Sequence, residues 1–477
     1  MRFEHEKNIF MQHLVTLVKP FILFSLLVSL LNLGSGCASL PNVSKMIHEV
    51  SPTNKPNQIV SAHGPLSDNE SQVIIDQLKQ TVPPTDILTG YLAVMDAWSK
   101  TPLTSGNKVT LLADEDTAYA AMFKAIQNAK DHINIETFFI EDDEIGHKFS
   151  QLLQQKQLQG VQVNIIYDSF GSSKTPVSFF KHLQDAGINL VEFHSTSPPG
   201  TSGPWLQLRF DHRKILIVDG TLAITGGANV SRGCSLKGFG AKNGKKPAVT
   251  WRDTDVQIEA PAVGQLQKHF LNTWQQRGGQ KLSKRSYLPK LKEEGNVIVR
   301  IVANSPGEHK RQTFVMYVSA ITFARHSVHL TTAYFVPDKQ ITKALTDAAK
   351  RGVDVKLILP ALSDSPMSVE AGRSYYSGLL KAGVKIYEYR KAILHAKTAV
   401  IDGIWSTVGS TNMDYWSFLS NDEINAVVLD GQFAAEMESL FEKDIGQSDQ
   451  IKLKDWKKRP FFSRLGESFA RLFVYWL

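Results

Sequence analysis

Cysteine is almost absent from this chain. Among 477 residues only Cys37 and Cys234 occur, and nothing around them resembles a metal site or a site of thiol catalysis. If Cys37 is acylated, a single thiol remains and no internal disulfide can form. The two cysteines therefore predict neither a thiol-dependent reaction nor a cysteine-ligated metal site, and we expect no cofactor.

The N-terminal region lacks an apolar run long enough for a comfortable transmembrane span. Its run from Phe21 to Leu31 follows several basic residues and leads through small residues to Cys37. That layout is typical of an export signal with a bacterial lipobox, although an uncleaved anchor would fit the same run. We expect residues 1–37 to be an export segment, with Cys37 lipidated and the protein on the periplasmic side of a bacterial membrane.

Negative charge is in deficit, since the formal net charge is +7. This favours an anionic partner, either acidic lipid or nucleic acid. Residues 451–477 combine a basic cluster with apolar and aromatic side chains at helical spacing, which suits an anionic membrane surface. A terminal helix packed on the preceding domain is the alternative. No aromatic-rich groove for single strands is apparent, which disfavours nucleic acid.

What the chain does contain is the pattern His-x-Lys-x-x-x-x-Asp, twice. The copies read HRKILIVDGTLAITGGAN and HAKTAVIDGIWSTVGSTN, and their pattern residues are His212, Lys214, Asp219, His395, Lys397 and Asp402. Asp-Gly between two apolar runs predicts a β-hairpin with a two-residue loop. Counting back from that loop places His395 opposite Ser410 and His212 opposite Gly227.

A His, a Lys and an Asn should then converge at one end of each hairpin, with Asn229 in the first and Asn412 in the second. Lys and Asn donate hydrogen bonds to phosphate oxygens, and imidazole can be a nucleophile or an acid. The Asp of each pattern lies at an odd offset from its His, so its expected role is structural. A single copy would more simply be an ordinary hairpin, but two copies in matching contexts favour catalysis.

The repeat extends beyond the motif. AKDHINIETFFIEDD matches ARHSVHLTTAYFVPD, and GVQVNIIYD matches GVDVKLILP. Each half alternates helix and strand, which predicts an α/β fold with mixed sheets and two similar domains, at 106–288 and 289–450. Residues 38–105 read as a linker and N-terminal extension. Packing about a pseudo-two-fold axis would bring both His-Lys clusters into one site.

These motifs resemble the phospholipase D superfamily, most closely the bacterial cardiolipin synthases. The resemblance implies paired α/β sandwich domains, His212 as the nucleophile and His395 as the acid and then the base. It also implies phosphate-binding or orienting roles for a further set, which is Asn229, Ser410, Asn412, Asp253 and Glu423. One departure is Trp416, where many synthase-like members have an Arg, so the substrate preference cannot be carried over.

The resemblance implies a membrane-bound phosphatidyltransferase that condenses phosphatidylglycerol into cardiolipin through a phosphohistidine. The anionic phospholipid is then its substrate and the membrane surface its partner. A hydrolytic phospholipase D, in which water takes the second step, is the main alternative, and a nucleic-acid phosphodiesterase is a less favoured one. The acceptor and the oligomeric state stay open at this point.

Overall fold

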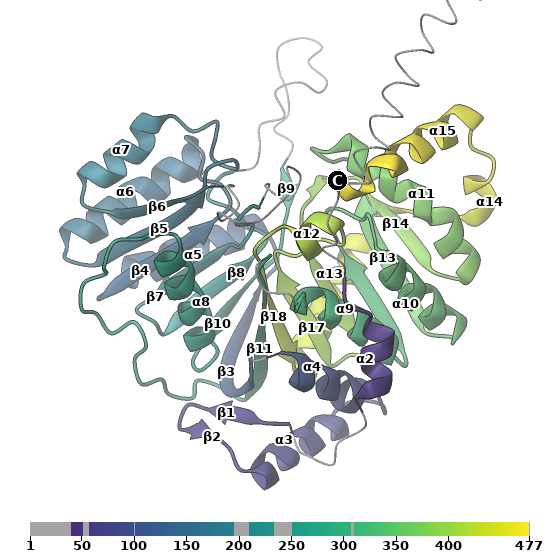
Figure 1. The fold of residues 1–477 in the computed structure, drawn as a ribbon, viewed down its shortest axis with the longest axis horizontal. Helices are drawn as coiled ribbons and strands as arrows, with labels where there is room; N and C mark the ends of the chain where they lie inside the picture. The colour runs from purple at the N-terminus through teal and green to yellow at the C-terminus, as the bar shows by residue number, and fades with distance from the viewer. Residues whose placement is uncertain are drawn as a thin grey trace, which may run out of the picture. The chain divides into compact units, whose positions relative to one another are not determined.

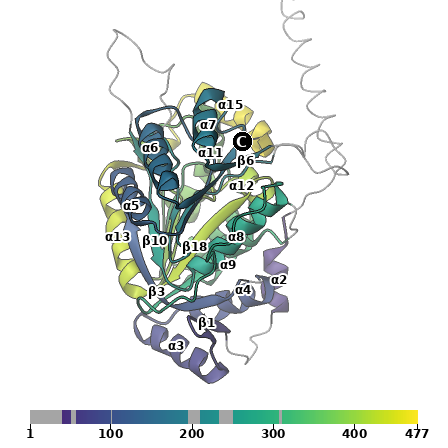
Figure 2. The same cartoon turned by 90° about the vertical axis from the view of Figure 1, so that its left-hand side faces the viewer.

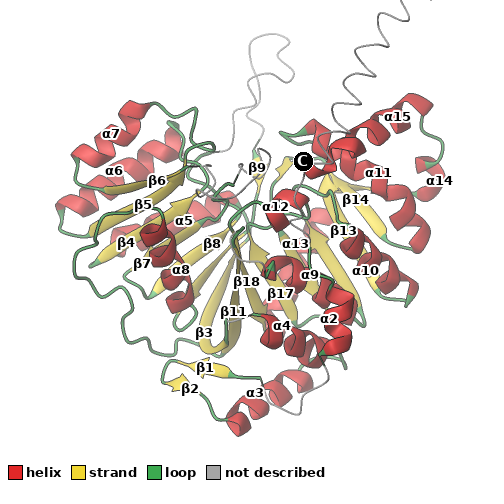
Figure 3. Ribbon diagram, in the orientation of Figure 1, coloured by secondary structure: helices red, strands yellow, loops and turns green. Residues whose placement is uncertain are grey.

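The computed structural model describes residues 40–476 apart from 51–56, 100, 195–208, 233–249 and 307–309. Within this part of the chain, 17 strands join in one mixed sheet flanked by helices (Figures 1 and 3). The predicted α/β class with mixed sheets is confirmed. The expected export segment 1–37, with Cys37, lies outside the described residues, as does Cys234.

The two halves repeat the same order of elements. The first half runs β3 (Leu103–Leu112), α5 (Glu115–Asn128), β4 (His132–Thr137), α6 (Glu144–Leu158), β5 (Gln162–Asp168), α7 (Val177–Asp185), β6 (Asn189–Phe193), β7 (Ile215–Val218), β8 (Leu222–Gly226), β10 (Asp255–Glu259) and α8 (Val263–Gln276). The second runs β11 (Val297–Asn304), α9 (Gln312–Phe323), β12 (Ser327–Thr331), α10 (Lys339–Lys350), β13 (Asp354–Pro360), α11 (Pro366–Ala382), β14 (Lys385–Tyr389), β16 (Thr398–Ile401), β17 (Trp405–Gly409), β18 (Glu423–Leu429) and α13 (Gly431–Ile445).

Strand pairing joins the halves symmetrically. The order is β6-β5-β4-β7-β8-β10-β3 in one half and β14-β13-β12-β16-β17-β18-β11 in the other. The equivalent strands β3 and β11 pair antiparallel, with Asn107 opposite Val297. An antiparallel pair of equivalent strands is what a two-fold axis produces, so the predicted repeat is confirmed.

The core is shared between the halves. One apolar cluster draws on α8 and on α13, and on strands from both halves, including Ile217 and Val256 from the first and Ile301 and Val408 from the second. Figure 2 shows α5 and α13 on one side of the central strands and α8 and α9 on the other. Because this cluster belongs to neither half alone, burying it fixes the two hairpin motifs relative to one another.

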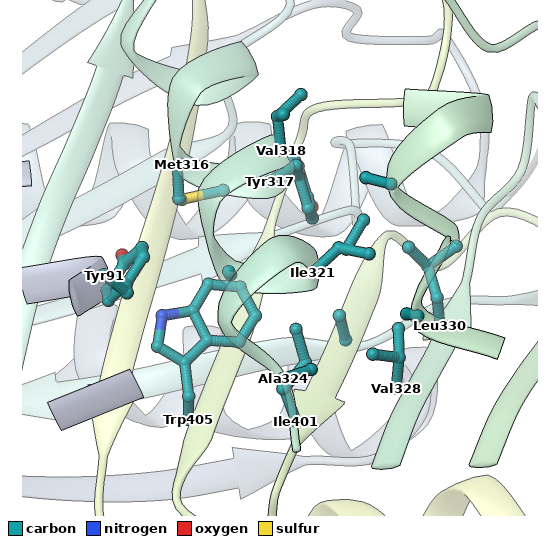
Figure 4. Close-up of a cluster of buried hydrophobic side chains, with 14 of the residues drawn as sticks. Tyr91, Met316, Tyr317, Val318, Ile321, Ala324, Val328, Leu330, Ile401 and Trp405 are labelled. Carbon is teal, nitrogen blue, oxygen red and sulfur yellow. The ribbon is translucent and has the colours of Figure 1, made fainter. Parts of the chain in front are cut away.

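The N-terminal extension is folded, which corrects the expected linker. Its described parts form α2 (Val43–Glu49), β1 (Ile59–Ser61), β2 (Gly64–Pro65), α3 (Asp68–Gln80), the π-helical turn η1 (Ile87–Tyr91) and α4 (Leu92–Trp98). Some of its polar residues are helix caps, since Asn42 caps α2 and Ser67 forms a capping box with Glu70. Tyr91 packs edge-on against Trp405, with ring centroids 5.8 Å apart, in the second half's core (Figure 4).

The motif hairpins have a three-residue connection, so the predicted register was wrong by one. Val218 pairs with Leu222 and Ile401 with Trp405. Asp402 and Gly403 both have positive φ, but a third residue, Ile404, completes the turn by donating its N–H to the carbonyl of Ile401. The Lys397 carbonyl accordingly accepts from the N–H of Gly409, and each His and Lys lies just before its strand rather than within it.

The motif aspartates fix the far ends of these hairpins. Asp219 accepts backbone N–H groups of residues 130–132, and Asp402 those of residues 325–327, at 2.8 to 3.0 Å. A four-residue strand separates each Asp from the catalytic end of its motif. Although both aspartates belong to the catalytic pattern, their position is that of structural supports that tie β7 to the start of β4 and β16 to the start of β12.

The C-terminal segment packs on the second half. It forms α14 (Leu453–Trp456), α15 (Phe461–Ala470) and the 3-10 helix η2 (Arg471–Trp476), and both α15 and η2 lie against α11 (Figure 1). Ala470 is buried there, while Leu472 and Tyr475 are exposed. None of the helices in the described part of the chain is long and apolar enough to cross a bilayer.

Candidate active site

His212 is held by an acid from the other half. It lies just before β7, and its Nδ1 is 3.0 Å from Oε1 and 3.1 Å from Oε2 of Glu423, the first residue of β18. Glu423 also accepts a hydrogen bond from the Ser410 hydroxyl. With Nδ1 engaged by a carboxylate, Nε2 is the imidazole atom that can meet a substrate.

His395 makes the reciprocal contact. Its Nδ1 lies 2.6 Å from Oδ2 of Asp253, which the first half supplies from the residues between β9 (Trp251–Arg252) and β10. β9 pairs in parallel with β15 (Ile393–Leu394), and the N–H of His395 donates to the carbonyl of Arg252. Each histidine is therefore oriented by the opposite half, and both pairs are buried.

Asp253 and Glu423 occupy equivalent positions of the repeat, yet their surroundings differ. Ser410 bonds to Glu423, while its counterpart in the first half is Gly227, which packs directly on the Asp253 carboxylate. A Cβ at position 227 would overlap that carboxylate. Gly227 is thus required by the close approach of Asp253, not by backbone conformation.

Both motif lysines reach into the same site. Lys214 Nζ donates to the carbonyl of His212 at 2.6 Å, and Lys397 Nζ donates to the carbonyl of His395. Both side chains are buried, and each lowers the pKa of the histidine in its own motif. Two buried ammonium groups beside two imidazoles provide the positive charge that a phosphate needs.

Both motif asparagines lie three residues after a strand, Asn229 after β8 and Asn412 after β17. Asn229 accepts hydrogen bonds through its side-chain oxygen from the N–H of Phe139 at 3.4 Å and the hydroxyl of Thr137 at 3.5 Å. Asn412 is buried, and its side-chain oxygen has no hydrogen-bond partner among the described residues. The structure thus joins each predicted histidine to its predicted acid and lysine, whereas Asp219 and Asp402 lie at the far ends of the hairpins. Asn229 and Asn412 keep their phosphate-binding role as a prediction.

Burial sets the protonation states of the ionisable groups in this site. It lowers the pKa of His212 to about 4, against the opposing effect of the Glu423 carboxylate. Burial also raises the cost of ionising Glu423, but His212 and Ser410 hold the pKa of that carboxyl below its ordinary value. At neutral pH His212 is thus a neutral imidazole beside a carboxylate, which is the state of a nucleophile.

Burial also lowers the pKa values of Lys214 and His395. It lowers the pKa of Lys214 to about 7, with a further contribution from the like charge of Lys397. The pKa of His395 is also lowered by burial and by Lys397, while Asp253 acts in the opposite direction. An anionic phosphodiester bound between the two lysines and His395 would favour the charged forms of these side chains. Protonated His395 could then give its proton to the leaving group.

A buried ion network that sequence reasoning missed braces the His212 side. The Arg213 guanidinium donates to Glu136 at 3.1 Å and to Asp422 at 3.0 Å. Asp422 precedes Glu423, and its carbonyl accepts the N–H of His212 at 3.0 Å. Arg213 occupies the variable position between His212 and Lys214, so the only sequence signal for its role is that it is adjacent to His212. The network of Arg213, Glu136 and Asp422 holds His212 and Glu423 together across the two halves.

Aromatic rings connect the two histidines along the first half. Phe138 lies 5.2 Å from the His212 ring and 5.7 Å from Phe139, and Phe139 lies 6.4 Å from Trp251. Trp251 in turn lies 4.3 Å from the His395 ring. These rings exclude water from one wall of the site, which strengthens its electrostatic interactions.

Trp416, which stands where many synthase-like proteins have an Arg, packs against the first half. It lies in α12 (Tyr415–Leu419) and stacks on Phe210 of the first half, with centroids 5.2 Å apart and an interplanar angle of 13°. Phe210 also contacts Phe138 and Phe170. Trp416 therefore completes the aromatic wall from the second half, a contact that the sequence did not reveal because it depends on how the halves pack.

The fold and the paired His-acid site define a phosphoryl-transfer enzyme of the phospholipase D type. Residues 122–274 and 317–445 match the family described as "Cardiolipin synthase, PLD-like domain". The chain is 35% identical over 374 residues to a cardiolipin synthase of Geobacillus thermodenitrificans, covering 78% of this chain and 72% of that protein. It is 32% identical to cardiolipin synthase A of Pseudomonas fluorescens, covering 80% and 77%.

A solved structure shares the fold. The phosphatidylserine synthase of Haemophilus influenzae superposes with a TM-score of 0.57 at 12% identity, covering 77% of this chain and 95% of that one. Taken with the family match, this chain belongs to the cardiolipin synthase family and is a phosphatidyltransferase of the phospholipase D superfamily.

Gly227→Ala should impair catalysis without unfolding the protein. The new methyl group would displace the Asp253 carboxylate and misorient His395, so we expect kcat to fall at least about 100-fold, as for loss of a positioned acid-base group. Ser410→Ala is the matched variant, since it removes the hydroxyl that bonds to Glu423 and to the backbone of Ile424 but leaves the Glu423 carboxylate in place, and it should have a smaller effect. Equal activity of Gly227→Ala and wild type would contradict this role for Asp253.

We expect kcat/KM to fall both at low pH and at high pH. As pH falls towards 4, His212 gains a proton and loses its nucleophilic lone pair, so kcat/KM should fall. As pH rises through about 7, Lys214 loses its charge, so kcat/KM should fall again. A bell-shaped profile is therefore expected, with limbs that belong to the coupled groups. A rate that keeps rising well above pH 7 would contradict the assignment of Lys214.

Proposed function

We propose that this enzyme condenses two phosphatidylglycerol molecules into cardiolipin and glycerol through a phosphohistidine. The observation that carries the proposal is the crossed pair of buried His-acid contacts, one per half, within one site. A two-step transfer needs a nucleophile and a separate acid, and two histidines in different environments supply both. The named relatives support the lipid substrate.

In the first step Nε2 of His212 attacks phosphorus, and the bond from phosphorus to the glycerol headgroup oxygen breaks. His395, as imidazolium, gives its proton to that oxygen, and glycerol leaves. Lys214 and Lys397 balance the charge that builds on the non-bridging oxygens. Glu423 stabilises the positive charge that develops on His212.

In the second step neutral His395 takes the proton from a hydroxyl of the second phosphatidylglycerol. That oxygen attacks phosphorus, the bond to His212 breaks, and cardiolipin forms. Both histidines return to their starting states. The aromatic wall of Phe138, Phe139 and Trp251 favours a lipid acceptor over water, because it limits the space for water beside the intermediate.

The purified enzyme should convert phosphatidylglycerol in nonionic detergent micelles to cardiolipin and equimolar glycerol, measured by mass spectrometry. Phosphatidic acid without cardiolipin would show a hydrolase instead, and activity confined to DNA would contradict a lipid substrate. Either outcome would reject the proposed reaction.

Two variants separate the roles of the histidines. His395→Ala keeps the nucleophile, so substrate with a labelled phosphate should leave label on His212, while turnover falls by more than about 10⁴-fold. His212→Ala should neither turn over nor hold label. Label on His395 in His212→Ala would reverse the assignment.

We also propose that Cys37 carries a lipid anchor on the periplasmic side of the membrane. The basic start, the apolar run from Phe21 to Leu31 and the small residues before Cys37 support this. Cys37→Ala should move the protein from the membrane to the soluble fraction, since a lipid chain contributes about 0.8 kcal/mol per buried methylene. Unchanged membrane attachment would favour an uncleaved anchor.

A further inference from the structure

Exposed large apolar side chains gather on one edge of the described structure. Eleven such side chains occur among the described residues, and eight of them come from the loops after β5 and β13, the starts of the helices that follow, and the C-terminal segment. These eight are Phe170, Val177, Leu362, Met367, Leu465, Phe469, Leu472 and Tyr475. Single exposed apolar residues are ordinary, but a concentration on one edge indicates a binding surface.

The two loops repeat the feature at equivalent positions. Phe170 lies two residues after β5 ends and is 59% exposed, and Leu362 lies two residues after β13 ends and is 52% exposed. The helices that follow begin with exposed Val177 and Met367. Both halves therefore present apolar side chains where their parallel strands end.

This edge is also the edge of the catalytic site. Asp168 ends β5, and its carboxylate accepts the N–H of Asp211, the residue before His212, at 2.9 Å. In the second half Asp364 lies two residues after Leu362 in the loop after β13. Burial lowers the pKa of Lys397, and the negative charge of Asp364 partly opposes that shift. The exposed loops thus directly adjoin the groups that would hold the phosphate.

The C-terminal segment lies beside the same site. Tyr475 of η2 packs on Tyr415 of α12, with ring centroids 4.6 Å apart. α12 carries Trp416, which completes the aromatic wall across from Phe138. The segment η2, which carries exposed Leu472 and Tyr475, therefore lies against the helix that supplies part of the aromatic wall.

Positive charge accompanies these apolar groups. Residues 452–475 contain seven Lys and Arg against two Asp and Glu. Lys457, Lys458 and Arg464 are exposed, whereas the acidic Glu467 is buried in an ion pair with Arg459. Apolar side chains together with exposed cations match an anionic bilayer, whose headgroups attract the cations and whose acyl region accepts the apolar groups.

We propose that this edge, comprising the eight apolar residues and the basic C-terminal segment, docks the catalytic body on an anionic phospholipid bilayer. The inference rests on the proposed function, because it names the surface from which that site draws its lipids. Docking by this edge brings the site mouth to the depth of the headgroups. Both donor and acceptor can then enter from one leaflet while their acyl chains stay in the bilayer.

Vesicle binding of the full chain purified with Cys37→Ser tests the proposal without a lipid anchor. This protein should sediment with phosphatidylglycerol-containing vesicles and much less with phosphatidylcholine vesicles. Leu362→Ser/Leu472→Ser in the same background should weaken binding by roughly tenfold or more, because two apolar side chains stay in water. Lys457→Glu/Lys458→Glu should weaken binding mainly at low salt.

The matched control is Leu158→Ser. Leu158 is 83% exposed at the end of α6, just before β5 begins, and so lies at the opposite edge of the strands. It should bind vesicles as the parent protein does. Equal loss in this control, or no loss in the double variants, would overturn the proposal.

Activity in micelles separates this proposal from the proposed function. Leu362→Ser/Leu472→Ser should keep the parent rate on micellar phosphatidylglycerol, which also shows that it is folded, and lose rate only on vesicles. An inactive parent that still binds vesicles through this edge would reject the reaction and retain the docking surface. A parent dimer that the double variant abolishes in light scattering, with unchanged vesicle binding, would assign the edge to a second copy and overturn lipid docking.

Discussion

The structure depends on one constraint, which is that each catalytic histidine is oriented by a carboxylate from the opposite half. His212 faces Glu423 and His395 faces Asp253, so neither half contains a complete catalytic unit. The shared apolar core and the pairing of β3 with β11 hold the halves close enough for these contacts. Fixing them in advance means that little reorganisation is needed when charge develops on the imidazoles.

The two repeated histidines are both buried, but their surroundings differ. A duplicated motif would give two identical histidines, but their neighbours differ: Ser410 bonds to the acid of one pair, and Gly227 packs on the acid of the other. The Arg213 network braces the His212 side, and the His212 ring contacts Phe138 whereas the His395 ring contacts Trp251. Such differences let one imidazole act as a nucleophile and the other as an acid.

Much of the fold followed from pattern. Alternating helices and strands gave the α/β class, and internal similarity gave the two halves with one site. The predicted hairpin register was wrong by one residue, because the loop at Asp402 has three residues and includes Ile404. The linker prediction for residues 38–105 was wrong for the described part of that segment, because polar residues such as Asn42 and Ser67 cap helices there and are equally common in turns.

The sequence by itself indicated the proposed reacting groups, since His212, Lys214, His395 and Lys397 stand out from their spacing alone. It also indicated that Asp253 and Glu423 belong with them. Only the tertiary structure decided which acid serves which histidine, that Trp416 stacks on Phe210, and that Arg213 joins the two halves. The reason is physical: spacing along a strand fixes local neighbours, whereas contacts between residues some 200 positions apart depend on how two apolar surfaces pack.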